Sequence, residues 1–224
     1  VYNNMSIGLA ITGLVAIGIS MLAIAGVSPT GKVTALTPLG QALYLSPLKW
    51  VVMLAPLAFI LFFSFKAESM SSSTARAMFF AFAAVMGVSL SSIFIVFTGE
   101  SIARVFFITA ATFGGVSLYG YTTKKALSGM GSFLIMGLIG LVIASVVNIF
   151  LASSALQFAI SVIGVLVFAG LTAWDTQRLK EMYLYSDMGP EEAAKMSVNG
   201  ALSLYLNFVN MFQMLLSLFG NKSE

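Results

Sequence analysis

The sequence predicts an all-α integral membrane protein, a bundle of seven transmembrane helices that form one domain over residues 1–224. Composition is the first reason, because the chain is 59% hydrophobic and only 8% charged, whereas a soluble domain is about a quarter charged. Length is the second, because seven apolar runs each approach the roughly 20 residues that a membrane helix needs. Charge placement is the third, because the ionisable residues lie between these runs or near their ends.

The predicted transmembrane helices are residues 5–27, 48–65, 75–97, 101–121, 131–152, 156–174 and 198–219. Ala23-Ile24-Ala25 in the first run imitates a signal-peptidase site. The run is nevertheless too long for a signal peptide and has no basic segment before it, so we expect a retained helix. The chain opens at Val1 rather than at methionine, which predicts further residues upstream.

Polar segments between the runs give further expectations. The first connection contains prolines and glycines and is expected to carry a short interfacial helix around residues 39–44. Ser71-Ser72-Ser73-Thr74 offers an N-cap for the third helix. Charge concentrates between Arg178 and Lys195, and this segment is predicted to be amphipathic and to lie along the membrane surface.

The residue types that are missing exclude several functions. With no cysteine and no histidine, the chain has no thiolate chemistry, no zinc-protease motif and no serine–histidine hydrolase site. The last helix lacks the lysine that a retinal protein needs. Only one aspartate lies at membrane depth, where an aspartyl protease needs two. We therefore expect no enzymatic function, no catalytic residue and no bound cofactor.

Asp175 is that aspartate, at or just inside the end of the sixth predicted helix. A carboxylate there is costly and needs a partner, so it is a candidate functional residue and a candidate metal ligand. The alternative is a helix-end residue whose carboxylate lies in interfacial water. Arg178 follows at i+3 and Lys66 ends the second helix, so both are candidate charge partners.

The seventh helix carries a polar stripe on an otherwise apolar surface. At about 100° per residue, its small polar side chains fall within an arc of about 80°. The stripe consists of Asn199, Ser203, Asn207, Asn210 and Ser217. We expect Asp175 to contact this stripe, which would then line a polar pathway. The alternative for Asn207 is a buried amide that only joins helices, which would contribute about 1 kcal/mol.

The distribution of lysine and arginine predicts orientation. Seven lie on one side of the predicted membrane and four on the other. By the positive-inside rule, the N-terminus and the 2–3, 4–5 and 6–7 loops are cytoplasmic and the C-terminus is outside. The net charge of +3 is small and spread over the loops, which favours lipid headgroups as partners and not nucleic acid.

Three stretches resemble the Bax-inhibitor family, also called the transmembrane Bax inhibitor motif family. One is Tyr119–Lys125 (YGYTTKK) with its continuation Leu127–Leu134 (LSGMGSFL). The others are Gly170–Gln177 (GLTAWDTQ) on the sixth helix and Leu204–Phe212 (LYLNFVNMF) on the seventh. The resemblance covers nearly the whole chain. It implies a bacterial inner-membrane protein in which six helices surround a central seventh.

The resemblance also implies a pH-sensitive calcium leak, with calcium as the permeant ion. In the family, two aspartates on the sixth and seventh helices share a proton and latch the pore near its cytoplasmic mouth. Asp175 matches the first of them, and the second position is Asn207, which is not an acid. An Asp–Asn pair keeps a hydrogen bond but loses the mutual repulsion of two carboxylates.

Two hypotheses follow from the sequence. The first is a calcium leak channel gated by Asp175 against the polar face of the seventh helix. The second is a regulator without transport of its own that modulates an ATP-dependent membrane protease, which some bacterial members of the family resemble.

Overall fold

The computed structural model describes residues 1–222, which divide into two compact units. The first unit contains residues 1–99, residues 188–202 and residues 221–222. The second contains residues 100–187 and 203–220. The last long helix therefore contributes its first part to one unit and its remainder to the other.

Seven helices among the described residues are long and apolar enough to cross a membrane, which confirms the all-α membrane fold. They are α1 (Tyr2–Ala23), α3 (Leu48–Lys66), α4 (Ser72–Leu90) with its continuation α5 (Ile93–Val96), α6 (Gly99–Thr122), α7 (Ser128–Leu151), α8 (Ser154–Tyr185) and α9 (Pro190–Phe219). The apolar window of α9 has the largest buried share, 56%, whereas those of α3 and α7 are 11% buried. Large apolar side chains on the exposed helix surfaces suit contact with lipid tails.

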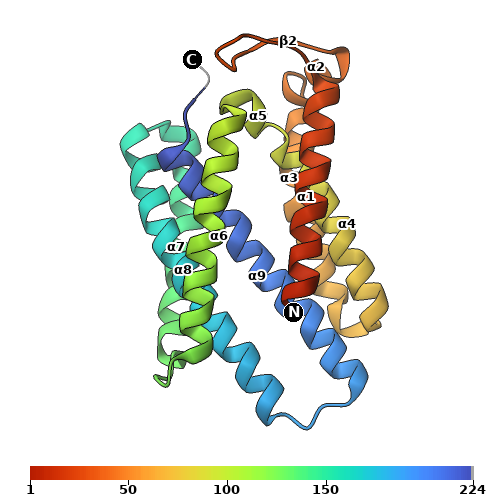
Figure 1. Ribbon diagram of the computed structural model, residues 1–224, viewed down its shortest axis with the longest axis vertical. Helices are drawn as coiled ribbons and strands as arrows, with labels where there is room; N and C mark the ends of the chain where they lie inside the picture. Colours follow the sequence, from red (N-terminus) through yellow and green to blue (C-terminus); the bar gives the residue numbers. More distant parts are fainter. Residues whose placement is uncertain (223–224) are drawn as a thin grey trace. The chain divides into compact units, whose positions relative to one another are not determined.

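In the first unit, α1 packs on α4 and α4 packs on α3 (Figure 1). Close approach of α1 and α4 depends on Gly87, because a Cβ added there would lie 2.7 Å from the carbonyl oxygen of Thr12. The buried Thr12 hydroxyl donates a 2.8 Å hydrogen bond to the carbonyl of Ala83. Small residues and hydroxyls at such contacts are typical of helix pairs in membranes. The predicted N-cap of α4 is confirmed, because the Ser71 hydroxyl accepts from the backbone N–H of Thr74.

The first connection differs from its prediction. We expected a helix through Val27, but α1 ends at Ala23 and an antiparallel hairpin follows, β1 (Ile24–Val27) and β2 (Val33–Leu36). Gly31 adopts a positive φ of 84° in the turn, a conformation that glycine adopts without strain. The valines of both strands favour extended backbone. The short helix predicted around residues 39–44 is confirmed as α2 (Pro38–Tyr44).

A break at Ser91 and Ser92 separates α4 from α5, where we predicted one uninterrupted helix. Ser91 is fully buried and its hydroxyl lies 2.7 Å from that of Tyr44 on α2. The Ser91 hydroxyl also donates to the carbonyl of Val88 in the preceding turn. Burial raises the pKa of the Tyr44 phenol, and the bond to Ser91 only partly offsets this. The phenol is therefore a neutral hydrogen-bonding group that ties α2 to the break.

The second unit is built on close contacts along α8. A Cβ added at Gly120 of α6 would lie 2.2 Å from the carbonyl oxygen of Ala173, so only glycine fits where α6 and α8 meet. α7 packs along α8. Aromatic rings fill the space between α6 and α9, with Phe208 lying 5.4 Å from Phe113 and 5.6 Å from Phe106 between ring centroids. Edge-to-face pairs of this kind add to the energy of apolar burial.

The predicted end of the sixth helix at residue 174 and the predicted start of the seventh at residue 198 are wrong, whereas the location of residues 178–195 along the membrane surface stays a prediction. α8 continues to Tyr185 and α9 begins at Pro190, so residues 186–189 alone connect them. The physical reason is local propensity, because residues 178–185 contain no glycine or proline. Proline at the first position of α9 suits a helix start, where its missing N–H has no partner to lose.

Candidate functional site

Asp175 lies inside α8 and is 3% exposed. It therefore does not sit at a helix end, and the reading of Asp175 as an interfacial residue in water does not hold. An ionised carboxylate that leaves water needs hydrogen-bond donors or an opposite charge. The surrounding side chains supply both.

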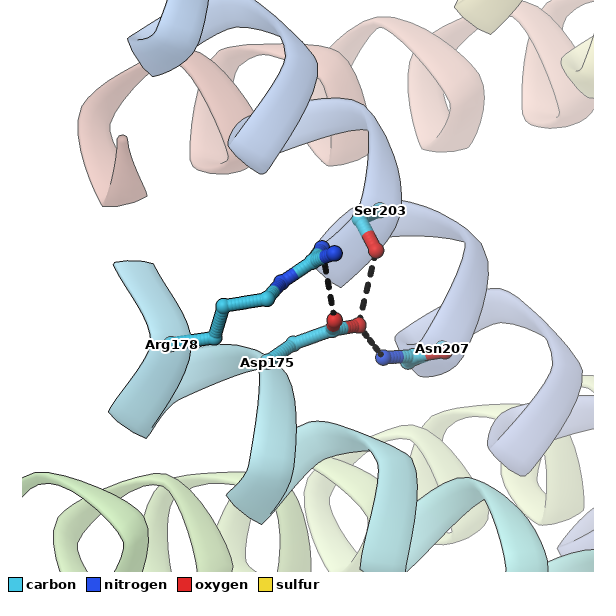
Figure 2. A network of polar contacts seen from close by, with 4 residues as sticks. All are labelled: Asp175, Arg178, Ser203 and Asn207. Carbon is cyan, nitrogen blue, oxygen red and sulfur yellow. Dashed lines mark hydrogen bonds and ion pairs between the residues drawn. The ribbon is translucent and has the colours of Figure 1, made fainter. Parts of the chain in front are cut away.

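Three donors point at the two oxygens of Asp175 (Figure 2). The Arg178 Nη2 atom lies 3.1 Å from Oδ1. The Ser203 hydroxyl donates to Oδ2 at 2.7 Å, and the Asn207 amide donates to the same oxygen at 2.8 Å. Arg178 is on α8, whereas Ser203 and Asn207 are on α9, so the carboxylate joins the two helices.

These contacts set the cost of separating α8 from α9 at this point. A hydrogen bond to a charged group contributes about 1.5–3 kcal/mol, and a buried donor left without an acceptor costs about 1–3 kcal/mol. Asn207 is 6% exposed, so its amide would lose its acceptor without gaining water. Arg178 adds less, because 46% of its side chain is exposed and solvent screens the ion pair.

Gln177 was not identified from the sequence, although it is 6% exposed and fixes the opposite side of α8. Its side-chain oxygen accepts from the backbone N–H of Leu127 at 2.7 Å, and its side-chain nitrogen donates to the carbonyl of Lys125 at 2.8 Å. The Gln177 side chain thus accepts one hydrogen bond from the backbone of the loop between α6 and α7 and donates one to it. The only feature of the sequence that could have indicated a role for Gln177 is that its amide lies two residues after Asp175.

Trp174 and Arg178 form a stacked pair next to the carboxylate. The Arg178 guanidinium carbon lies 4.8 Å from the centroid of the Trp174 ring. The ring also lies close to Gly131 of α7, where an added Cβ would be 2.6 Å from ring atoms. One guanidinium therefore contacts both the indole ring and Asp175.

The predicted polar stripe divides into three kinds of residue. Ser203 and Asn207 contact Asp175, as expected. Asn210 donates to the carbonyl of Leu206 in its own helix. Asn199 and Ser217 are exposed, and Asn199 belongs to the first unit. A continuous polar pathway along the stripe stays a prediction.

The remaining predicted partners are Lys66 and a metal ion. Lys66 ends α3 in the first unit, where it is exposed, and its pairing with Asp175 stays a prediction. No group of three or more carboxylates occurs at metal-binding distance within residues 1–222. Asp175 as a metal ligand is likewise still a prediction.

Fold and site together define a multi-pass α-helical membrane protein with a buried carboxylate between two of its long helices. The family model described as inhibitor of apoptosis-promoting Bax1 matches residues 1–224. A protein of Caulobacter vibrioides is 46% identical over 100% of this chain and 88% of its own length. The Escherichia coli inner membrane protein YbhL is 49% identical over 73% of this chain and 70% of its own. The Rickettsia prowazekii protein RP147 is 49% identical over 73% of this chain and 69% of its own. The chain belongs to the Bax inhibitor family, which confirms the resemblance found in its sequence.

Proposed function

We propose that this protein is a calcium leak channel of the bacterial inner membrane, and that Asp175 gates it against the polar face of α9. The observation that carries the proposal is the buried carboxylate with two donors from α9. A buried charge between membrane helices is costly and is found where ions or protons are handled. The inner-membrane location is supported by the similarity to YbhL, which is named for that membrane.

The gate works as a latch between two helices. With its carboxylate ionised, Asp175 accepts all three hydrogen bonds and holds α9 against α8. Protonation removes the charge that attracts Arg178 and converts one oxygen into a donor that faces donors. We therefore expect acidification to weaken the latch and to increase the leak.

The pH response differs in origin from that of a pair of acids. Two neighbouring carboxylates cannot both ionise easily, so one proton is shared between them. Asn207 donates through its amide at every pH, so the latch in this chain needs no shared proton. Asp175 also has no histidine to assist it, because the chain contains none. The carboxyl of Asp175 is therefore the proposed sensor.

Calcium flux from proteoliposomes at several pH values tests the proposal. Wild type is compared with Asp175→Asn, and Asp187→Asn serves as the matched control because Asp187 is an exposed acid in the connection after α8. We expect Asp175→Asn to change the flux and flatten its pH response, and Asp187→Asn to leave both unchanged. Vesicles that stay calcium-tight at every pH would end the channel proposal and favour a regulator without transport.

A further inference from the structure

We propose that Trp174 is a positioning residue for the gate, because it holds the Arg178 guanidinium against Asp175 and is itself held by Gly131 of α7. The strength of the latch between α8 and α9 would then depend on a third helix. This inference rests on the proposed role of Asp175 as a gate. Its test uses a spectroscopic signal that does not require ion flux.

The Arg178 guanidinium is a weak counter-ion for Asp175 unless another group orders its side chain. With 46% of its side chain exposed, its ion pair is of the kind that usually adds little to stability, since solvent screens it and a long side chain must be ordered. Stacking on an aromatic face removes much of that disorder, because the planar guanidinium is then held in one orientation. Trp174 provides this face at 4.8 Å.

Helix geometry lets the one guanidinium of Arg178 contact both Trp174 and Asp175. Arg178 follows Asp175 at i+3 and Trp174 at i+4, and both spacings place side chains on one face of α8. The indole directs the guanidinium to Oδ1, while Oδ2 stays free for the two donors of α9. The arginine and the α9 donors therefore do not compete for the same oxygen.

Helix α7 restricts the position of the Trp174 indole. Gly131 is buried, and a methyl group there would lie 2.6 Å from the Trp174 ring, closer than carbon atoms pack. The ring thus contacts both α7 at Gly131 and the Arg178 guanidinium. A shift of α7 at Gly131 would move the ring and, through it, Arg178.

The side chains of the second unit that are described around Asp175 offer few other groups that could change charge with pH. Ser203 and Asn207 face Asp175 from α9 and are uncharged. Lys180 is directed to α6, where its Nζ atom donates to the carbonyl of Tyr121 and lies over the ring of that residue. The Asp175 carboxyl is therefore the group whose protonation would release Arg178.

Trp174 can report this change, because the chain contains only two tryptophans, Trp50 and Trp174. In Trp50→Phe protein, emission from Trp174 is recorded over a series of pH values, first downward and then back to the starting pH. We expect a reversible change with pH that disappears in Asp175→Asn and in Arg178→Gln. A pH-dependent change of the same size in Asp175→Asn overturns the proposal.

A pair of glycine substitutions tests the contribution of α7. Gly131→Ala adds a methyl group against the indole, whereas Gly129→Ala adds the same group in open space near the start of the same helix. We expect Gly131→Ala to shift the midpoint or reduce the amplitude of the emission change, and Gly129→Ala to match the parent. Identical titrations of the two variants would overturn the role of α7.

Two conservative variants keep the test decisive if an altered protein folds poorly. Trp174→Phe retains an aromatic face, and Arg178→Lys retains the charge without a planar group to stack. In proteoliposomes we expect the pH profile of calcium flux to be closer to that of wild type in Trp174→Phe than in Trp174→Leu. We expect Arg178→Lys to lose part of the pH dependence. Equal profiles for Phe and Leu at position 174 would contradict a positioning role. An intact emission titration in calcium-tight vesicles would separate a failed channel proposal from this one.

Discussion

Two carboxylates in this protein make similar hydrogen bonds in opposite surroundings. Asp175, in the second unit, is 3% exposed and accepts from an arginine, a hydroxyl and an amide. Glu191, in the first unit, is exposed at the start of α9. Its Oε1 accepts from the backbone N–H of Ser72 at 2.6 Å, and its Oε2 accepts from the Ser72 hydroxyl at 2.7 Å.

The difference shows that bond lengths alone do not give the importance of a contact. Glu191 binds at the amino end of α4, where free N–H groups and the helix dipole favour an anion. If the Glu191 carboxylate moves away, water can accept the hydrogen bonds of Ser72 in its place. The Asn207 amide has no such replacement for its acceptor, because Asn207 is 6% exposed. The buried carboxylate is therefore expected to control both stability and function, and the exposed one to adjust only local order.

Removal of the buried carboxylate should have the largest effect. Asp175→Ala leaves the Ser203 hydroxyl and the Asn207 amide without their acceptor, so we expect a loss of about 3 kcal/mol in the free energy of unfolding. Thermal unfolding in detergent measures it. Asp187→Ala, at an exposed acid, is the control and should leave the midpoint unchanged. A loss as small as that of the control would mean that the cluster does not hold α8 and α9 together.

A second acid at the site should create a different pH dependence. In Asn207→Asp, two carboxylates would face each other where the amide nitrogen now lies 2.8 Å from Oδ2, so one of them would hold a proton and release it as the pH rises. We expect stability and calcium flux to vary more steeply with pH than in wild type. Asn199→Asp, at an exposed position of the same helix, should not have this effect. A response as flat as that of the Asn199 variant would count against contact between the two acids.

Substitution of Gln177 should have the third-largest effect. Gln177→Ala removes two hydrogen bonds to the loop between α6 and α7, so we expect a loss of about 1–3 kcal/mol and faster hydrogen exchange at the Leu127 amide. Gln177→Glu keeps the acceptor for Leu127 and loses the donor to Lys125. The exchange rate at Leu127 should therefore rise less in the Glu variant. Equal rates in both variants would show that the side-chain oxygen does not protect this amide.

Much of the fold was predictable because membrane helices leave strong signals. The seven apolar lengths, the Ser71 cap and the short helix that ends at Tyr44 all follow from composition or local chemistry. The hairpin after Ala23 was missed because four-residue strands are too short to show periodicity against an apolar helix. The extension of α8 to Tyr185 was missed because charge ends the lipid-immersed part of a helix, and not the helix itself.

The site was predictable only where a periodic pattern carried it. Ser203 and Asn207 were expected to meet Asp175 because helical periodicity places them on one face of α9, and Arg178 because i+3 neighbours are in reach. Gln177 could not be found in this way, because its partners are backbone atoms of a loop that no side-chain pattern marks. The Trp174–Gly131 contact also needs coordinates, since an absent side chain gives no signal for which ring occupies its place.

Substitution of the exposed carboxylate, Glu191, should give the smallest effect, and high salt should reduce that effect further. Glu191→Gln keeps an oxygen for one Ser72 donor but loses the charge beside the amino end of α4. We expect faster hydrogen exchange at the Ser72 amide with no change in calcium flux. About 1 M salt should reduce the difference from wild type, because it shortens the screening length to about 3 Å. Glu192→Gln, an exposed neighbour, is the control. An effect on flux as large as that of Asp175→Asn would mean that exposure does not separate the two carboxylates, and that the start of α9 takes part in gating.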